Sequence, residues 1–387
     1  MATTSRRRHP VATPPGSPGG SPERRWRGRT KVAVFAGVCA VALVATVLSV
    51  SHGSRVATIP GQPASHDSLP AAGLAGGPYL LFRSTSLNHD YGLVGLVPGT
   101  DPGGPRILSS LKCDRVDYSG SRGICLSRPT TGVFNPPTSA IVFDDHFRTL
   151  STVETAGYPS RAQVSPDGSL ASVTTFVSGD SYATMGTFST RTEIIDLKSG
   201  KVLFGLEKLT VSRDGHPFQA VDFNFWGVTF ANDNRHFYAT LGTGGRPYLI
   251  QGDVVTRTAS VVQADVECPS LSPDNHLLAF KKRRPGATVS WQLSVLDLRT
   301  MTEHPLAETQ TVDDQASWLD NATVAYGLPV SQPDINAGDK QAAVPPVLTT
   351  GAALPTNTWE VPADGTGAPT LLEPGAWSTG LTRLDHS

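Results

Sequence analysis

Four aspartates recur along the chain and are the first groups that could supply acid–base chemistry. They are Asp167, Asp233, Asp274 and Asp320. Catalysis needs one unique group, whereas a residue that occurs once in every repeat is expected to build the scaffold. Each aspartate is followed by Gly or Asn, which tolerate the positive φ of a tight turn, and an aspartate side chain can bond the turn backbone. We therefore predict that these four carboxylates form turns.

Linear motifs of known catalytic chemistry are missing from the sequence. There is no GxSxG nucleophile motif, because Gly120-Ser121-Arg122-Gly123 has the wrong spacing. No HExxH, CxxC or EF-hand spacing occurs, and the 10 histidines are scattered singly. The sequence thus predicts no catalytic residue, no metal site and no cofactor. It leaves open whether the protein is an enzyme.

Three long polar segments interrupt the apolar runs, at 178–191, 207–226 and 328–358. The first two carry candidate binding residues of hydrogen-bonding, charged and aromatic types, namely Asp180, Ser181, Tyr182, Arg191, Asp222, Asn224 and Trp226. This mixture suits a sugar, peptide or protein surface, with Tyr182 and Trp226 as the preferred anchors. Alternatively these residues cap and pack their own loops, and Trp226 is a core residue.

Cys113 and Cys125 flank a short segment that is expected to form a β-hairpin. Hairpin strands bring such residues close to the distance that a disulfide needs. An ideal register centred on Gly120-Ser121 would place Cys125 opposite Val116, so a bridge requires a bulge or a wider loop. We expect this disulfide to form and Cys268 to stay free and buried.

The elements that must position these residues are short strands. The 387-residue chain contains 38 Gly and 31 Pro and only 17% charged residues, whereas about a quarter is usual. From residue 78 onward, short apolar or alternating runs such as 79–82, 140–143 and 292–298 are separated by Gly, Pro, Asp and Asn. This pattern predicts an all-β fold.

A repeated unit makes the prediction more specific. The segment RAQVSPDGSLASVTTFV (161–177) recurs as CPSLSPDNHLLAFKK (268–282) and more loosely at 226–241 and 315–328. Four antiparallel strands in a repeat of this size are typical of a β-propeller blade. The repeat spacing predicts six blades, with seven as the main alternative. Five blades are expected at 111–156, 159–210, 220–265, 267–310 and 315–373, and the sixth combines an innermost strand from 375–384 with outer strands from 78–109.

The SPDG-type turns, each followed by an apolar strand and a VLDL-like strand, resemble the propeller repeats of TolB and its relatives. The arrangement at 111–329 is similar to the TolB-like (WD40-like) proteins of high-GC Gram-positive (actinobacterial) bacteria. The resemblance covers about residues 78–387 and implies the propeller architecture. TolB itself is a soluble periplasmic protein of an envelope complex, whereas this sequence predicts a membrane anchor and no separate α/β domain before the propeller.

The propeller places the starts of the innermost strands around the mouth of its central channel. Candidate channel-mouth residues are Arg161, Glu267, Asp314 and Gln315. Together with Asp313, the acids would form an acidic lip that could hold a cation or a basic peptide. Alternatively they pair with Arg161 and Lys281 and neutralise the channel.

The N-terminal region predicts a membrane anchor. Residues 1–31 carry eight basic residues and a single acid, and residues 32–50 form an uncharged apolar run. A helix of this length spans about 28 Å, close to the hydrocarbon core of a bilayer. The positive flank predicts a cytoplasmic N-terminus, with a linker at 51–77 and the propeller at 78–387 outside. A cleaved signal peptide, giving a secreted protein, is the alternative.

Two functions from different classes remain open at this stage. After residue 31 the chain holds 24 basic and 32 acidic residues, a net charge that argues against nucleic-acid binding. The first function is a recognition module at the outer surface of the cytoplasmic membrane, which binds an envelope protein, peptide or glycan. The alternative is a propeller lyase or hydrolase whose site lies among the long loops.

Overall fold

The computed structural model describes residues 77–86, 88–128, 137–178, 188–286, 290–330 and 355–383, together with a short strand at 66–68. All of them belong to the compact unit formed by residues 57–387. The basic tail, the expected membrane helix at 32–50 and most of the expected linker lie outside the described residues. Within the described ranges, no helix is long and apolar enough to cross a membrane.

The described strands form six sheets. Numbered in chain order with the composite sheet last, the first three blades have the following strands. Blade 1 contains β5 (Arg115–Ser119), β6 (Arg122–Ser127), β7 (Thr138–Phe143) and β8 (Thr149–Thr155). Blade 2 contains β9 (Tyr158–Val164), β10 (Leu170–Ser178), β11 (Ser189–Asp196) and β12 (Lys201–Gly205). Blade 3 contains β15 (Asn224–Phe230), β16 (His236–Thr243), β17 (Arg246–Asp253) and β18 (Thr258–Ala264), and its sheet also includes β13 (Thr210–Arg213) and β14 (His216–Pro217).

The other three blades complete the set. Blade 4 contains β19 (Glu267–Leu271), β20 (Leu277–Arg283), β21 (Trp291–Asp297) and β22 (Thr302–Pro305); blade 5 contains β23 (Ser317–Trp318), β24 (Thr323–Pro329), β25 (Thr356–Pro362) and β26 (Thr370–Glu373); blade 6 contains β27 (Ala376–Arg383), β2 (Pro78–Ser84), β3 (Leu93–Pro98) and β4 (Arg106–Lys112), with β1 (His66–Ser68) parallel to β4.

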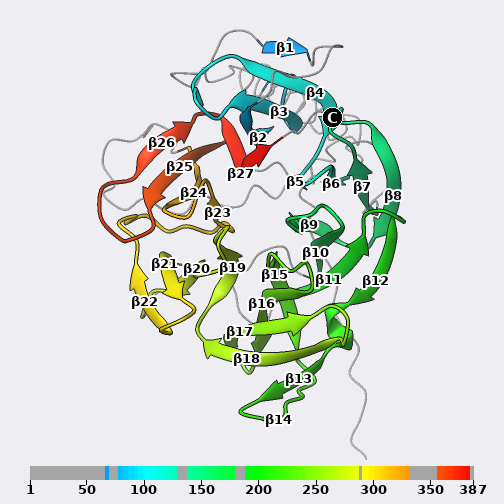
Figure 1. The fold of residues 1–387 in the computed structure, drawn as a ribbon, viewed down its shortest axis with the longest axis vertical. Helices are drawn as coiled ribbons and strands as arrows, with labels where there is room; N and C mark the ends of the chain where they lie inside the picture. The colour runs from blue at the N-terminus through cyan, green and yellow to red at the C-terminus, as the bar shows by residue number, and fades with distance from the viewer. Residues whose placement is uncertain are drawn as a thin grey trace, which may run out of the picture. The chain divides into compact units, whose positions relative to one another are not determined.

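The six sheets close into a ring around a central axis (Figure 1). The innermost strands β5, β9, β15, β19, β23 and β27 each contact the next, and β27 contacts β5. In blade 6, β27 from the C-terminal region pairs antiparallel with β2 from the N-terminal region. The structure is therefore a six-bladed propeller with the composite sixth blade that the sequence predicts.

The recurring aspartates form the turns between the first and second strands of their blades. In blade 2, Asp167 Oδ1 accepts hydrogen bonds from the Ser169 amide at 2.9 Å and the Ser165 hydroxyl at 2.8 Å. Gly168 follows with a φ of 72°, which only glycine adopts without strain. These contacts, together with equivalent backbone bonds to Asp233, Asp274 and Asp320, confirm the predicted turns.

Hydrophobic side chains pack between neighbouring blades and hold the ring together. One cluster joins Ile194 and Phe204 of blade 2 to Phe225 and Phe237 of blade 3, all at most 3% exposed. Because each such residue removes apolar surface from water, burial of this kind is the main stabilising term for the fold. The blades therefore provide a rigid frame for the residues at the two ends of the ring.

Candidate functional site

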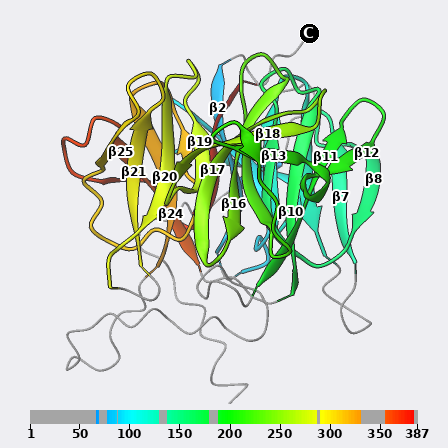
Figure 2. The ribbon, with the colours of Figure 1, turned by 90° about the horizontal axis from the view of Figure 1, so that it is seen from below.

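The strands run from one end of the ring to the other, as the side view shows (Figure 2). We call the end with the aspartate turns the turn side, where the innermost strands finish and the second strands begin. We call the opposite end the loop side, where the innermost strands begin and the second strands finish. In blade 2, for example, Val164 and Ala171 pair near the turn side, and Tyr158 and Phe176 pair near the loop side.

The two long segments that were expected to bind a partner are placed only in part. Asp180, Ser181 and Tyr182 lie outside the described residues. The expectation of an irregular loop at 207–226 is wrong, because this segment contains a 3-10 helix at Leu206–Lys208 and the strands β13 and β14. Strand β13 pairs parallel with β18 at the outer edge of blade 3. It therefore covers a sheet edge.

The ends of these two segments do touch, through Asn224. Its Oδ1 accepts hydrogen bonds from the amide and hydroxyl of Thr190 at 2.9 and 2.7 Å, and its Nδ2 donates to the Phe188 carbonyl at 3.3 Å. The Asn224 side chain thus ties β15 of blade 3 to β11 of blade 2. These bonds give it a structural role.

Trp226 is fully buried and cannot be the exposed anchor that was expected. It packs with Phe176, Phe188, Cys268 and Trp291 in one cluster, and its ring centroid lies 5.3 Å from that of Phe188 in an edge-to-face arrangement. Both faces of the inner strand β15 are covered by neighbouring blades, so a tryptophan there contributes to the core. The alternative interpretation, a core tryptophan, is the one that the structure supports.

Asp222 and Arg191 lie on the surface. The carboxylate of Asp222 accepts hydrogen bonds from the Thr243 hydroxyl at 2.6 Å and the Gly244 amide at 2.7 Å. These bonds lower its pKa below the ordinary value and brace the turn between β16 and β17. Arg191 is exposed on β11, opposite Thr175 of β10.

The acidic residues of the loop side are paired, in agreement with the neutralising alternative. Glu267 Oε1 accepts hydrogen bonds from Arg283 Nε at 2.7 Å and from Trp291 Nε1 at 3.3 Å. Lys281 Nζ lies 2.6 Å from Asp313 Oδ1. Burial alone would lower the pKa of Lys281, but Asp313, Cys268 and Glu267 together outweigh burial and raise it. The acids therefore do not form an open acidic lip.

Asp314 and Gln315 lie in the connection before blade 5, and both are largely buried. Asp314 accepts hydrogen bonds from the Gly327 amide of β24 at 3.1 Å and from the Gln315 amide at 2.9 Å, so it fixes this connection to blade 5. The side chain of Gln315 donates to the carbonyls of Val228 at 3.2 Å and Pro269 at 3.0 Å, which belong to blades 3 and 4. Gln315 therefore links these blades to the connection before blade 5.

Three arginines from blades 6, 1 and 2 also lie on the loop side, and two of them are close enough to the acids Asp313 and Asp314 to interact with them electrostatically. Arg83 Nε donates to the Cys113 carbonyl at 2.7 Å, Arg115 Nε to the Ser160 carbonyl at 2.7 Å, and Arg161 Nη1 to the same Ser160 carbonyl at 2.9 Å. Burial, with the positive charges of Arg161 and Arg83, lowers the pKa of Arg115 to about 10, against the raising effect of the Asp314 and Asp114 carboxylates. We call Arg83, Arg115 and Arg161 the arginine cluster. Only Arg161 was identified from the sequence.

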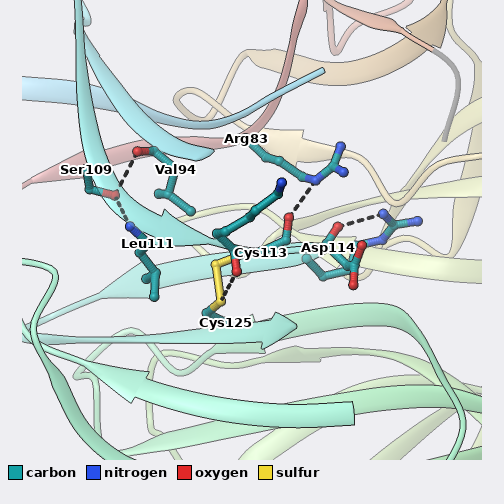
Figure 3. The surroundings of a disulfide bond; sticks show 9 residues. Arg83, Val94, Ser109, Leu111, Cys113, Asp114 and Cys125 are labelled. Atoms are coloured by element: carbon teal, nitrogen blue, oxygen red, sulfur yellow. Dashed lines mark hydrogen bonds between the residues drawn. A yellow bond between two sulfur atoms is a disulfide. The ribbon is translucent and has the colours of Figure 1, made fainter. Parts of the chain in front are cut away.

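The expected disulfide fixes the start of blade 1 beside this cluster (Figure 3). Cys113 and Cys125 are bonded with a Cα–Cα distance of 5.5 Å. Cys125 pairs with Val116 in the β5–β6 ladder, as the ideal hairpin register requires. Cys113 lies in the short connection between β4 and β5, so the expectation that the bridge needs a bulge or a wider loop is wrong. The bond thus holds the carbonyl of Cys113, which accepts the hydrogen bond from Arg83. Cys268 is free and buried.

The turn side contains a small cavity that sequence analysis missed. It has a volume of about 230 Å³ and is lined by residues of blades 1 to 5, including Asp117 of β5. Elsewhere in the described part of the chain, and here as well, no group of three or more His, Cys, Asp or Glu side chains gathers as metal ligands would.

Comparison with known proteins finds structural but no sequence relatives. No protein-family model and no curated protein matches the chain. TolB from Acinetobacter baumannii has a TM-score of 0.47 at 13% identity, covering 79% of this chain and 67% of that one. A putative TolB from Agrobacterium tumefaciens has 0.44 at 10% identity, covering 80% and 94%. A chain of a nidogen/laminin complex has 0.46 at 10% identity, covering 79% and 98%. At these values the likenesses show no function, and the propeller assignment rests on the strand topology.

Proposed function

We propose that the protein is a membrane-anchored, extracytoplasmic recognition module of the cell envelope. In this proposal the loop side binds an acidic group of an envelope protein, peptide or glycan. The observation that carries it is the arginine cluster, in which the charges of Arg83 and Arg161 both act on Arg115, while the carboxylates of Asp314 and Asp114 offset part of this charge. Three guanidinium groups beside two carboxylates leave an excess of positive charge, which attracts an acidic group of a ligand.

The chemistry of the cluster favours a carboxylate or a similar planar acid. An arginine carries five N–H donors in a fixed fork that matches a carboxylate in a bidentate arrangement. The three hydrogen bonds to main-chain carbonyls hold the guanidinium planes in place. A site held in this way loses little conformational entropy when it binds.

The anchoring part of the proposal rests on the N-terminal sequence. Eight basic residues precede the uncharged run at 32–50, an arrangement that leaves the basic flank in the cytoplasm. A disulfide between Cys113 and Cys125 is of the kind that persists in oxidising compartments outside the cytoplasm. The similarity of the repeats to TolB-like proteins of high-GC Gram-positive bacteria supports an envelope location in such an organism.

A capture experiment with matched variants tests this function. Full-length protein in detergent micelles is immobilised and exposed to the envelope fraction of its own organism. We expect a bound component that wild type and a turn-side control, Asp274→Asn, retain equally and that Arg115→Gln loses. Equal retention by all three proteins, with Arg115→Gln folded by circular dichroism, would show that the arginine cluster is not the binding site.

A further inference from the structure

Five of the six inner strands each contribute one polar residue near their turn-side end to the lining of the turn-side cavity. These residues are Asp117, Gln163, Thr229, Ser270 and Ser317. Four of the five side chains are neutral, and Asp117 alone carries a charge. The other four of these positions carry an amide or a hydroxyl. The carboxylate in blade 1 is therefore the feature that distinguishes the cavity.

The Asp117 carboxylate is held by hydrogen bonds from its own blade and from the neighbouring blade, including the backbone of Tyr118. Its Oδ2 accepts hydrogen bonds from the Val164 amide at 2.6 Å and from Gln163 Nε2 at 3.0 Å. The residue is only 6% exposed, so the carboxylate has little access to bulk water.

Among the side chains that the structure describes, the lining of the cavity provides no cation for this carboxylate. Among the described residues that line it there is no lysine, arginine or histidine, and Tyr118 is the only titratable side chain besides Asp117. Burial raises the pKa of Asp117 to about 7, against the lowering effect of the backbone hydrogen bonds. A buried carboxylate without a cationic partner is costly, and a bound cation would offset this cost.

The other lining residues include two aromatic side chains, which favour an organic cation. Phe230 and Trp318 contribute aromatic side chains, and the indole N–H of Trp318 donates to the Ser270 carbonyl at 2.9 Å, which fixes the ring. Aromatic faces attract ammonium and guanidinium groups. The volume of about 230 Å³ is below the range of drug-sized ligand sites, so it suits one head group.

We infer that the turn-side cavity binds a guanidinium or primary ammonium group through the carboxylate of Asp117. The site is separate from the arginine cluster and does not depend on it. Such a group could belong to a free amine or to a basic side chain of a partner chain. The two sources share the same recognition chemistry and can be distinguished by the choice of probe.

Calorimetric titration of the full-length protein in micelles tests this site at about pH 8. The probes are methylguanidinium, acetyl-Gly-Arg-Gly-amide, and the same peptide with citrulline, which is nearly isosteric with arginine but neutral. We expect the arginine peptide to bind at least about tenfold more tightly than the citrulline peptide, because only arginine offers a charge to the carboxylate. Binding of methylguanidinium as well indicates a free cation as the ligand, and binding of the peptide alone indicates a partner chain.

Variants and pH make the test decisive. Asp117→Asn keeps an oxygen that can accept both hydrogen bonds but removes the charge, so the arginine peptide should bind it no better than the citrulline peptide. The control Asp274→Asn, on the same side of the ring, should bind as wild type does. If Asp117→Asn does not fold, wild type at about pH 5.5 replaces it, since protonation of Asp117 should weaken binding about tenfold or more. Equal binding of the two peptides, or no binding at about 10 mM, overturns the inference.

Discussion

The substitution Asp117→Asn should make the protein more stable at neutral and alkaline pH, although it removes a side chain that bonds to the neighbouring blade. Asparagine retains an oxygen that can accept the hydrogen bonds from Val164 and Gln163. What it loses is the charge, which in this cavity faces no cation among the lining residues. Removing an uncompensated buried charge is favourable when the hydrogen bonds survive.

The magnitude follows from the difference in proton affinity between the folded and unfolded states. The pKa of Asp117 rises from 3.8 to about 7 on burial. Since the folded state binds the proton more tightly, the contribution of Asp117 to the stability of wild type is greatest below pH 4 and falls as the pH rises to 7. Each pKa unit is worth about 1.4 kcal/mol, so the full loss is about 4 kcal/mol. Asparagine does not titrate and does not contribute this loss.

Denaturant unfolding of both proteins between about pH 4 and pH 8 measures this effect. The free energy of unfolding of Asp117→Asn minus that of wild type should increase by about 4 kcal/mol over this range. Other carboxylates with altered pKa, such as Asp167 and Asp274, titrate equally in both proteins and cancel in the difference. A difference that does not change with pH would refute the reasoning, because Asp117 would then have an ordinary pKa in the folded state.

Three further predictions concern the disulfide, the buried tryptophan and the membrane topology. Replacing both Cys113 and Cys125 by Ala opens a loop with a sequence separation of 12 and should lower the free energy of unfolding by about 3 kcal/mol; a denaturant midpoint like that of wild type would contradict this. Trp226→Ala should cost about 3–5 kcal/mol because it leaves a cavity in a fully buried cluster, whereas Arg191→Ala on the exposed face should change stability by less than about 0.5 kcal/mol. In intact cells an external protease should digest the propeller and leave an N-terminal tag protected; mature protein in the medium that begins after residue 57 would instead indicate a cleaved signal peptide.

The blade architecture could be predicted because its signals are local. The turn formed by Asp167 and Gly168 depends on hydrogen bonds between residues that are close in sequence. A short segment of the sequence is therefore enough to predict it. The composite sixth blade follows from the same reasoning, since strands remain at both ends of the repeat array and only pairing of β27 with β2 closes the ring.

The placement of single residues depends on contacts that are distant in sequence. Strand β13 is only four residues long, and its pairing with β18 joins segments almost 50 residues apart. Trp226 gave no signal of burial, because Phe225 beside it is also buried and strands covered on both faces lose the alternation that identifies an exposed face.

Asp117 illustrates why a repeat protein hides its distinctive residues. In the sequence it stands two residues before a serine in a hairpin turn, where a polar residue needs no explanation. Its partners Gln163 and Val164 come from the next blade, so the contact depends on how two repeats lie side by side. The signal that could have identified it is the comparison of equivalent positions, where the neighbouring blades carry Gln163, Thr229, Ser270 and Ser317. The residues that the copies of a repeat share determine the scaffold. Among the five polar lining residues named above, only Asp117 carries a charge. Recognition chemistry can arise at such a position without altering the fold.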